Sequence, residues 1–288
     1  MKRTGFLPAV LSLSSLLAVD SARGGDPDPW TVLAPGLELG EFPVDPEPGI
    51  GDGVITVLRI DASSWELGLY CAADPSLSRE SPGGSGVPAN RTARAWCRDA
   101  GLVAAINAGM FAQDYTTHVG YLAAGDYVNN DNVNGYESVA VFGSLLPDGP
   151  PFRIFDRDDG AEVVLLRRSF RHLVQNLRLI KRPGENRWSR QKKRWSEAAL
   201  GEDAEGRALF LFCGTPYTMH HLNRLLIGLP IGLIAAQHLE GGPEAQLYVK
   251  VGGFEREWKG VFETGFFQGD GTGSAWPVPN VIGVRGRE

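Results

Sequence analysis

The chain has 288 residues, of which 43% are hydrophobic and 22% charged, so it can bury one large core or two small ones. Its formal net charge of −6 and isoelectric point near 5.5 exclude an overall basic field that would attract nucleic acid or an anionic membrane. Recognition of an anion must therefore be local, which favours a pocket.

The first residues predict a secretory signal peptide, residues 1–24. Lys2 and Arg3 precede an apolar run, residues 5–19, that is short for a membrane span and is followed by small residues. Cleavage would leave an exported protein in the periplasm, the cell envelope or the medium. An uncleaved anchor helix is the alternative, and only through it do we expect contact with a membrane.

Residues 25–49 are interpreted as an N-terminal extension and residues 50–288 as one domain. No linker rich in Pro, Ser and Gly and longer than about a dozen residues interrupts the chain after residue 50.

The first predicted elements lie between residues 53 and 134. Alternating apolar residues in 53–71 predict two strands around a polar turn at 61–64, that is, a hairpin. Asn90 or Thr92 can cap a short helix that Gly101 ends. A buried strand at 102–107 follows, and the polar segment up to Asn134 is expected to be loop containing one strand pair.

Further strands are predicted at residues 137–143, 152–156, 177–181 and 207–213. Helices are predicted at residues 163–175 and 215–229, the second with Pro216 at its first helical position. Together these elements predict an α+β fold, a single domain with a mixed β-sheet and flanking helices.

Three cysteines, Cys71, Cys97 and Cys213, permit at most one internal disulfide and match no zinc motif. We interpret them as buried small hydrophobic residues. A Cys71–Cys97 disulfide in an exported protein is the alternative.

Two segments place polar residues at the end of an apolar strand. "INAGMF", residues 106–111, puts Asn107 at a strand exit, and Gly109 lets the backbone turn sharply beside a pocket. A structural turn with an Asx hydrogen bond is the alternative. "LIAAQHLEGGPEAQLYV", residues 233–249, ends its strand in Glu240, Gly241 and Gly242, where a carboxylate and backbone N–H groups can meet a ligand. The alternative is a Gly-Gly hairpin with solvated glutamates.

Residues 187–203 begin with five basic residues and two tryptophans in nine positions. Such a mixture can bind phosphate and stack on a sugar or base. In an acidic chain we expect a solvated loop without nucleic-acid binding, while local anion binding stays open. His220 and His221 lie in a helical pattern and point about 100° apart, so they cannot easily share a metal ion.

These segments, with "WPVPNVIGV" at 276–284, occur in an order that resembles the phosphodiester glycosidase family over roughly residues 50–285. The Asn-(Gly/Ala)-Gly-(Met/Phe)-Phe turn of that family is intact at 107–111. Glu240 stands where the family commonly has Asp, and Pro243-Glu244-Ala245 replace its Gly-Ser-Ser. Residues 197–201 fall where the family has Arg-Thr-Ala-Ile-Gly, so its guanidinium is missing.

The resemblance implies cleavage of a sugar joined through its anomeric carbon to a phosphodiester. Such chemistry needs donors for the phosphate, a carboxyl or water-activating base, and polar groups that hold the sugar. The implied roles are Glu240 as general acid/base or sugar-positioning group, Asn107 as orienter and Glu244 as second carboxylate. The implied substrate-binding residues are Gly109, Gly241, Gly242, Arg194, His118 and His238, the two histidines being candidates for proton transfer. No metal ligands and no cofactor are assigned.

Two functions follow. The first is an exported hydrolase acting on a glycan or sugar-phosphate substrate. The alternative, suggested by the missing Arg and Ser-Ser, is a catalytically inactive glycan-binding or structural protein of the cell envelope on the same fold.

Overall fold

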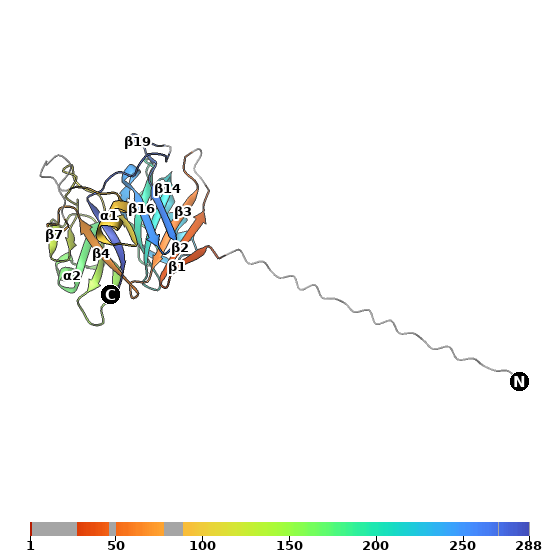
Figure 1. Ribbon diagram of the computed structural model, residues 1–288, viewed down its shortest axis with the longest axis horizontal. Helices are drawn as coiled ribbons and strands as arrows, with labels where there is room; N and C mark the ends of the chain where they lie inside the picture. Colours follow the sequence, from red (N-terminus) through yellow and green to blue (C-terminus); the bar gives the residue numbers. More distant parts are fainter. Residues whose placement is uncertain (2–27, 46–49, 78–88, 270, 288) are drawn as a thin grey trace.

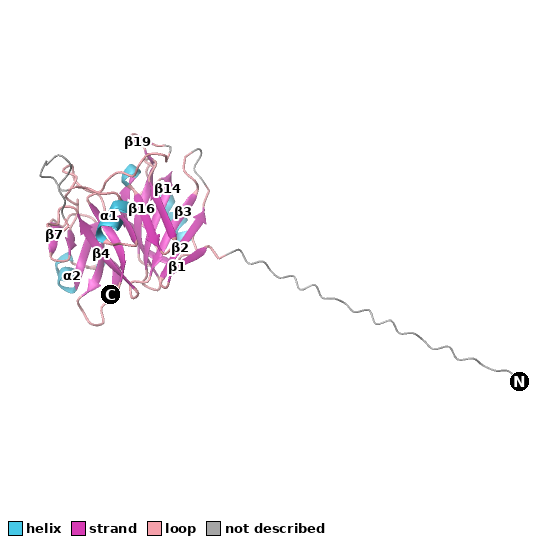
Figure 2. Cartoon of the chain, in the orientation of Figure 1, coloured by secondary structure: helices cyan, strands magenta, loops and turns pink. Residues whose placement is uncertain are grey.

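The structure is a computed structural model that describes residues 1, 28–45, 50–77, 89–269 and 271–287 (Figure 1). The predicted signal peptide lies outside these ranges except for Met1. Strands make up most of the regular secondary structure in the described chain, and Figure 2 shows few helices among them. Within the described ranges, no helix is long and apolar enough to span a bilayer.

The described strands form three sheets, and every pairing between them is antiparallel. The first sheet has the order β1 (Trp30–Ala34), β2 (Leu37–Pro43), β3 (Val54–Ile60), β14 (Ala208–Tyr217), β13 (Trp195–Asp203), β15 (Leu233–Gly241), β11 (Arg178–Lys181) and β12 (Glu185–Asn186), with β18 (Phe262–Glu263) on β13 and β19 (Phe267–Gln268) on β18.

The second sheet has the order β7 (Tyr127–Asn130), β6 (Leu122–Ala124), β10 (Phe170–Asn176), β8 (Ser138–Ser144) and β9 (Phe152–Asp156). The third has the order β17 (Phe254–Lys259), β16 (Gln246–Val251), β5 (Ala104–Asn107), β20 (Asn280–Gly286) and β4 (Trp65–Cys71). The helices are α1 (Ala93–Ala100), α2 (Val163–Ser169), α3 (Met219–Gly228) and the 3₁₀ turns η1 (Arg157–Asp159) and η2 (Gly242–Glu244).

One hydrophobic core joins the three sheets. Phe210 of the first sheet, Phe142 of the second and Ile282 of the third belong to it, and each is fully buried. The first sheet is covered on its other face too, because Leu209 and Leu211 pack in a second cluster with Leu222 of α3. Burial on both faces explains why residues 208–213 are apolar without alternation. Each such side chain contributes roughly 1.5–3 kcal/mol.

The expectation of an α+β fold is met in part, because the described chain is mostly β-structure with three short α-helices. The predicted cap of α1 is confirmed: the Thr92 side chain accepts a hydrogen bond from the N–H of Ala95 at 3.2 Å, and Gly101 ends the helix with φ of 67°.

Two predicted helices are wrong in part. The one at 163–175 ends at Ser169, because residues 170–176 pair with β8 and β6 as strand β10. The one at 215–229 begins only after Thr218, because Thr215 and Pro216 continue strand β14. In both cases pairing with distant strands overrides the local pattern.

The predicted hairpin at 53–71 is also wrong. The turn exists, but β3 pairs with β2 and β14 in the first sheet, whereas β4 pairs with β20 in the third. The Gly-Gly hairpin considered for 233–249 is wrong for the same reason, since β15 belongs to the first sheet and β16 to the third. The chain therefore crosses between sheets at residues 242–245.

The first sheet begins inside the range 25–49, because β1 and β2 lie there and β2 pairs with β3. The edge of the sheet therefore does not coincide with the domain boundary expected at residue 50. Cys71, Cys97 and Cys213 are buried free thiols, as interpreted from the sequence, and burial raises the pKa of each.

Candidate functional site

The crossing between two sheets gathers the candidate residues. In the antiparallel register of β13 and β15, Glu197 lies opposite Gly241 and Ala198 opposite Glu240. The next residues form η2, and the chain then enters β16, which pairs with β5. The start of β13, the end of β15 and the end of β5 thus meet at this crossing, which we call the junction (residues 240–246).

Asn107 holds the backbone of the junction through two hydrogen bonds. Its side chain is 1% exposed, its Nδ2 donates to the carbonyl of Glu244 at 2.7 Å, and its Oδ1 accepts from the N–H of Gln246 at 2.8 Å. Both partners are far away in sequence, so these bonds are not the local Asx turn considered as the alternative. Asn107 orients the backbone that carries Glu244, which supports a positioning role.

A buried acid–base pair lies beside the junction. The Nδ1 of His238 is 2.6 Å from Oε1 of Glu197, and the indole N–H of Trp195 donates to Oε2 of Glu197 at 2.7 Å. Glu197 and His238 are 1% and 4% exposed. The rings of Trp188 and Trp195 lie edge-on to His238, with centroids 6.4 and 6.3 Å away. The pair is held in one geometry with little access to water.

Each member of this pair affects the protonation of the other. Burial raises the pKa of Glu197, and the nearby His238 opposes this rise. Burial lowers the pKa of His238, but the Glu197 carboxylate outweighs this effect, so the pKa is raised. Both directions indicate that the pair retains a proton at neutral pH.

Glu240 has the most perturbed carboxyl at the junction. Burial raises its pKa to about 8, although His238 and a hydrogen bond from the N–H of Gly241 favour the ionised form. The carboxyls of Glu244 and Glu197 raise it further. Glu240 is therefore mostly protonated at neutral pH, and it can donate a proton or a hydrogen bond.

Glu244 follows three residues after Gly241 and is partly buried. Burial raises its pKa, a hydrogen bond with its own backbone lowers it, and the carboxyl of Glu263 raises it. The junction therefore holds two carboxyls, Glu240 and Glu244, whose pKa values are raised mainly by burial.

Glycines are needed at two places in the site. Gly242 has φ of +66°, and a Cβ there would lie 2.6 Å from Oε2 of Glu263. Gly109 has φ of +145°, and a Cβ there would lie 2.3 Å from Oδ1 of Asn176. Both positions combine a left-handed backbone with a close approach of polar side chains, so only glycine fits. Gly241 packs closely against the ring of Trp195.

The two remaining candidates lie apart from the carboxyls of the junction. His118 is fully buried, with Nε2 2.9 Å from the carbonyl of Gln175, and burial lowers its pKa to about 4. It is therefore neutral at physiological pH and joins the turn at Gly109 to β10. The backbone of Arg194 is bonded to Thr264, and its guanidinium lies 6.0 Å from the centroid of the Phe262 ring.

Sequence reasoning missed Glu197 as a functional candidate. It was noted only as the residue that replaces a family Arg, although a carboxylate at the start of the apolar segment "SEAALGED" needs a buried partner. Asn176, which donates to the carbonyl of Ala108 at 2.9 Å and closes the turn around Gly109, was also missed. No local pattern marks Asn176, because its contacts come from the neighbouring sheet.

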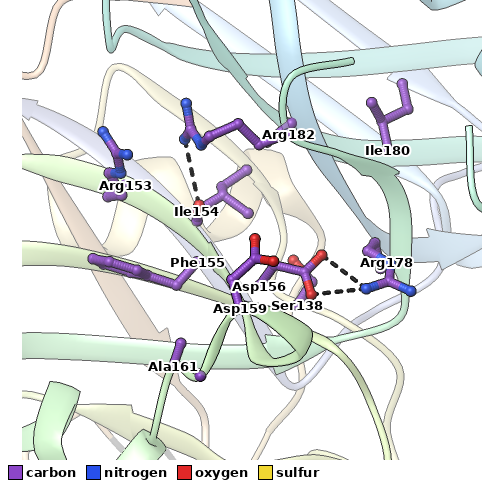
Figure 3. A pocket seen from close by; sticks show the side chains of 12 residues that line it. Ser138, Arg153, Ile154, Phe155, Asp156, Asp159, Ala161, Arg178, Ile180 and Arg182 are labelled. Carbon is purple, nitrogen blue, oxygen red and sulfur yellow. Dashed lines mark hydrogen bonds and ion pairs between the residues drawn. The ribbon is translucent and has the colours of Figure 1, made fainter. Parts of the chain in front are cut away.

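A separate cavity of about 330 Å³ lies between β9 and β11 (Figure 3). Nη1 of Arg178 is 2.7 and 2.8 Å from the two carboxylate oxygens of Asp156, and Arg182 binds the buried Glu202 at 2.7 Å. Glu137, Asp156 and Asp158 bring their oxygens within 4.8 Å of one another. Arg178 also binds Asp158, and Nζ of Lys181 lies 3.6 Å from the same carboxylate, so Asp156 and Asp158 already pair with cations of the protein, and we assign no ligand or metal there.

Comparison with known proteins places the chain in a family. The sequence profile of the phosphodiester glycosidases matches residues 100–285, more than half of the chain. No curated protein matches the sequence significantly.

Two solved structures have a similar fold. One is the zebrafish N-acetylglucosamine-1-phosphodiester alpha-N-acetylglucosaminidase catalytic domain, auto-inhibited by its pro-peptide. Its TM-score is 0.59 at 14% identity, covering 88% of this chain and 85% of that one. The other is a hypothetical protein from Synechocystis, with a TM-score of 0.59 at 15% identity, covering 91% of this chain and 64% of that one. With the profile match over residues 100–285, the chain belongs to the phosphodiester glycosidase family.

Proposed function

We propose that the chain is an exported hydrolase that cleaves the bond between the anomeric carbon of a sugar and a phosphodiester oxygen. Membership of the phosphodiester glycosidase family supports the reaction class. The observation that carries the proposal is the grouping of Glu240 and Glu244 at the junction, where the chain crosses between two sheets and Asn107 holds the backbone of Glu244. Lys2, Arg3 and the apolar run at residues 5–19 support export.

In the proposed reaction, water attacks the anomeric carbon while the bond from that carbon to the phosphate oxygen breaks. Glu244 takes a proton from the water, and Glu240 gives its proton to the departing oxygen. The products are the free sugar and a phosphate monoester. A protonated Glu240 also compensates for the missing Arg, because a neutral carboxyl donates a hydrogen bond to an anion that a carboxylate would repel.

The other residues hold these two groups in place. Asn107 fixes the backbone of Glu244 by a 2.7 Å hydrogen bond. His238 precedes Glu240 by two residues on β15, and its hydrogen bond with Glu197 of β13 links the two strands beside Glu240. Gly241 and Gly242 let the backbone pass closely against Trp195 and Glu263 as it crosses between the sheets.

The reaction is tested by incubating the purified protein with an aryl N-acetylglucosamine-1-phosphodiester and with UDP-N-acetylglucosamine. Free N-acetylglucosamine released in proportion to enzyme supports the proposal. Absence of sugar release from both substrates between pH 5 and pH 8 contradicts it for this sugar.

One observation favours a second function, an inactive glycan-binding protein. At the position of the family Arg stands Glu197, and its carboxylate is committed to His238 and Trp195. Under this alternative the protein binds the sugar phosphodiester without cleaving it. Measured binding of the substrate, together with no free sugar released in the assay, would indicate this second function.

A further inference from the structure

An exposed aromatic cluster lies next to the junction. The ring of Trp276 meets Phe267 edge-on with centroids 5.5 Å apart, and Phe266 with centroids 6.2 Å apart. Phe266 is 62% exposed and Trp276 39%. Grouped aromatic side chains in contact with water are unfavourable unless something binds them, so such a patch marks a binding surface. We call Phe266, Phe267 and Trp276 the aromatic rim.

A cavity of about 370 Å³ opens between the aromatic rim and the junction. Pro243 of η2 forms one wall, and Phe267 and Trp276 form another. Its polar lining comes from the side chains of Lys259, Gln268 and Ser274, together with backbone of several glycines. The volume falls at the lower end of the range of about 300–1,000 Å³ that small-ligand sites occupy.

The mixture of groups indicates the chemistry of the ligand. A pyranose ring has an apolar C–H face that can lie on an aromatic ring, and its hydroxyls need hydrogen-bond partners at the edge. An acyl chain offers no hydrogen-bond partner to Gln268 and Ser274, so covering these side chains would be costly, whereas the Lys259 ammonium already donates to the carbonyl of Gly273. A sugar therefore satisfies this lining better than a lipid does.

Hydrogen bonds tie the aromatic rim to the proposed reaction site. The side-chain amide of Gln246 donates to the carbonyl of Trp276 at 2.7 Å, and the backbone N–H of Gln246 donates to Asn107 at 2.8 Å. Pro243, in the wall of the cavity, lies between Gly242 and Glu244. A glycan bound at the junction would reach the aromatic rim with its next sugar unit.

We infer that the aromatic rim is a sugar-binding subsite, in which a pyranose ring stacks on Trp276 with its hydroxyls toward Lys259, Gln268 and Ser274. Resting on the proposed function, this inference places a further sugar unit of the substrate against Trp276. Stacking on the subsite itself requires no phosphodiester and no turnover.

The test is binding of neutral oligosaccharides by isothermal titration calorimetry on the full chain. The probes are chitohexaose, maltohexaose and cellohexaose, each compared with its monosaccharide. The variants are Trp276→Leu, which keeps an apolar side chain without a ring, and Trp276→Tyr, which keeps a ring. Leu165→Ala is the control, because Leu165 is 54% exposed and lies on helix α2, which packs against β10 and β8 of the second sheet.

We expect at least one hexasaccharide to bind the wild type more tightly than its monosaccharide. Trp276→Leu should weaken that binding about fivefold or more, as expected for loss of an aromatic stacking contact. Trp276→Tyr should stay within about twofold, and Leu165→Ala should have no effect. Melting temperatures of all variants establish that they are folded.

The inference is overturned if none of the three hexasaccharides binds, if Trp276→Leu binds like the wild type, or if Leu165→Ala weakens binding equally. Because the probes contain no phosphodiester, binding is measured independently of hydrolysis. A protein that binds hexasaccharide but releases no sugar from the phosphodiester keeps the subsite and loses the proposed reaction. A protein that releases sugar from the phosphodiester but binds no hexasaccharide keeps the proposed reaction and loses the subsite.

Discussion

The sequence indicated only some of the residues at the candidate site, and the reason differs from residue to residue. Glu240, Gly241 and Gly242 were found because they interrupt an apolar strand, and a strand end is visible in the sequence. Glu197 was not found, because its importance comes from His238, which lies 41 residues away. The roles of Asn107 and His118 likewise depend on partners from other strands.

The first prediction concerns the pH dependence of stability. Because the folded protein raises the pKa of Glu240 to about 8, it holds a proton there that the unfolded chain releases near pH 4.5. The free energy of unfolding should therefore fall as pH rises from about 5 to 8, by about 1 kcal/mol per pH unit, discounted because Glu240 is partly accessible. Urea denaturation of Glu240→Gln should give a flatter profile, and a parallel profile would contradict the raised pKa.

The second prediction concerns the Glu197–His238 pair. Glu197→Leu leaves His238 buried without its partner and should lower the free energy of unfolding by about 3 kcal/mol. The double variant Glu197→Leu/His238→Leu should recover much of that loss, because neither ionisable group is then buried without its partner and only the indole N–H of Trp195 loses its acceptor. Denaturant titrations of the two single variants and the double variant measure the coupling. Additive losses would show that the two side chains do not interact.

At the scale of elements, local patterns predicted strands better than they predicted partners. Residues 53–71 alternate as two strands should, yet β3 and β4 belong to different sheets. Residues 170–176 continue a helical pattern, yet they pair on both sides as β10. Caps were predictable, as at Thr92, because their hydrogen bonds are local. Pairing of distant strands leaves no such local signal.

The third prediction tests the crossing element η2. Gly242→Ala adds a Cβ in a left-handed backbone and 2.6 Å from Oε2 of Glu263, so it should destabilise the protein by about 2–4 kcal/mol. Gly206→Ala is the matched control, because Gly206 has φ of +80° with nothing within 4 Å of the added Cβ. Gly206→Ala should lower the free energy of unfolding by about 1 kcal/mol, because it adds only backbone strain. Equal thermal shifts in the two variants would show that the junction tolerates a side chain.

The whole molecule combines a β-rich body with an N-terminal segment whose sequence predicts export. Length and composition were compatible with one large core or two small ones, and one core joins residues of all three sheets. How the sheets meet could not be predicted, since this depends on contacts between residues such as Ser138 of the second sheet and Gln237 of the first, 99 positions apart.

The fourth prediction is removal of the N-terminal segment on export. Expression with the native N-terminus should yield an exported protein that begins at about residues 20–25, because small residues follow the apolar run. Mass spectrometry of the exported protein reads its first residue directly. A protein that retains Met1 and stays with the membrane fraction would instead support an uncleaved anchor.

We propose that Glu240 transfers a proton in the reaction at the junction. The kcat/KM of Glu240→Gln for an aryl N-acetylglucosamine-1-phosphodiester tests this role. The amide keeps the shape but cannot transfer the proton, so kcat/KM should fall by roughly 10²–10⁴-fold with little change in fold. Glu162→Gln, an exposed glutamate before α2, should leave it unchanged. A Glu240→Gln variant whose kcat/KM stays within a few-fold of the wild type would contradict the account.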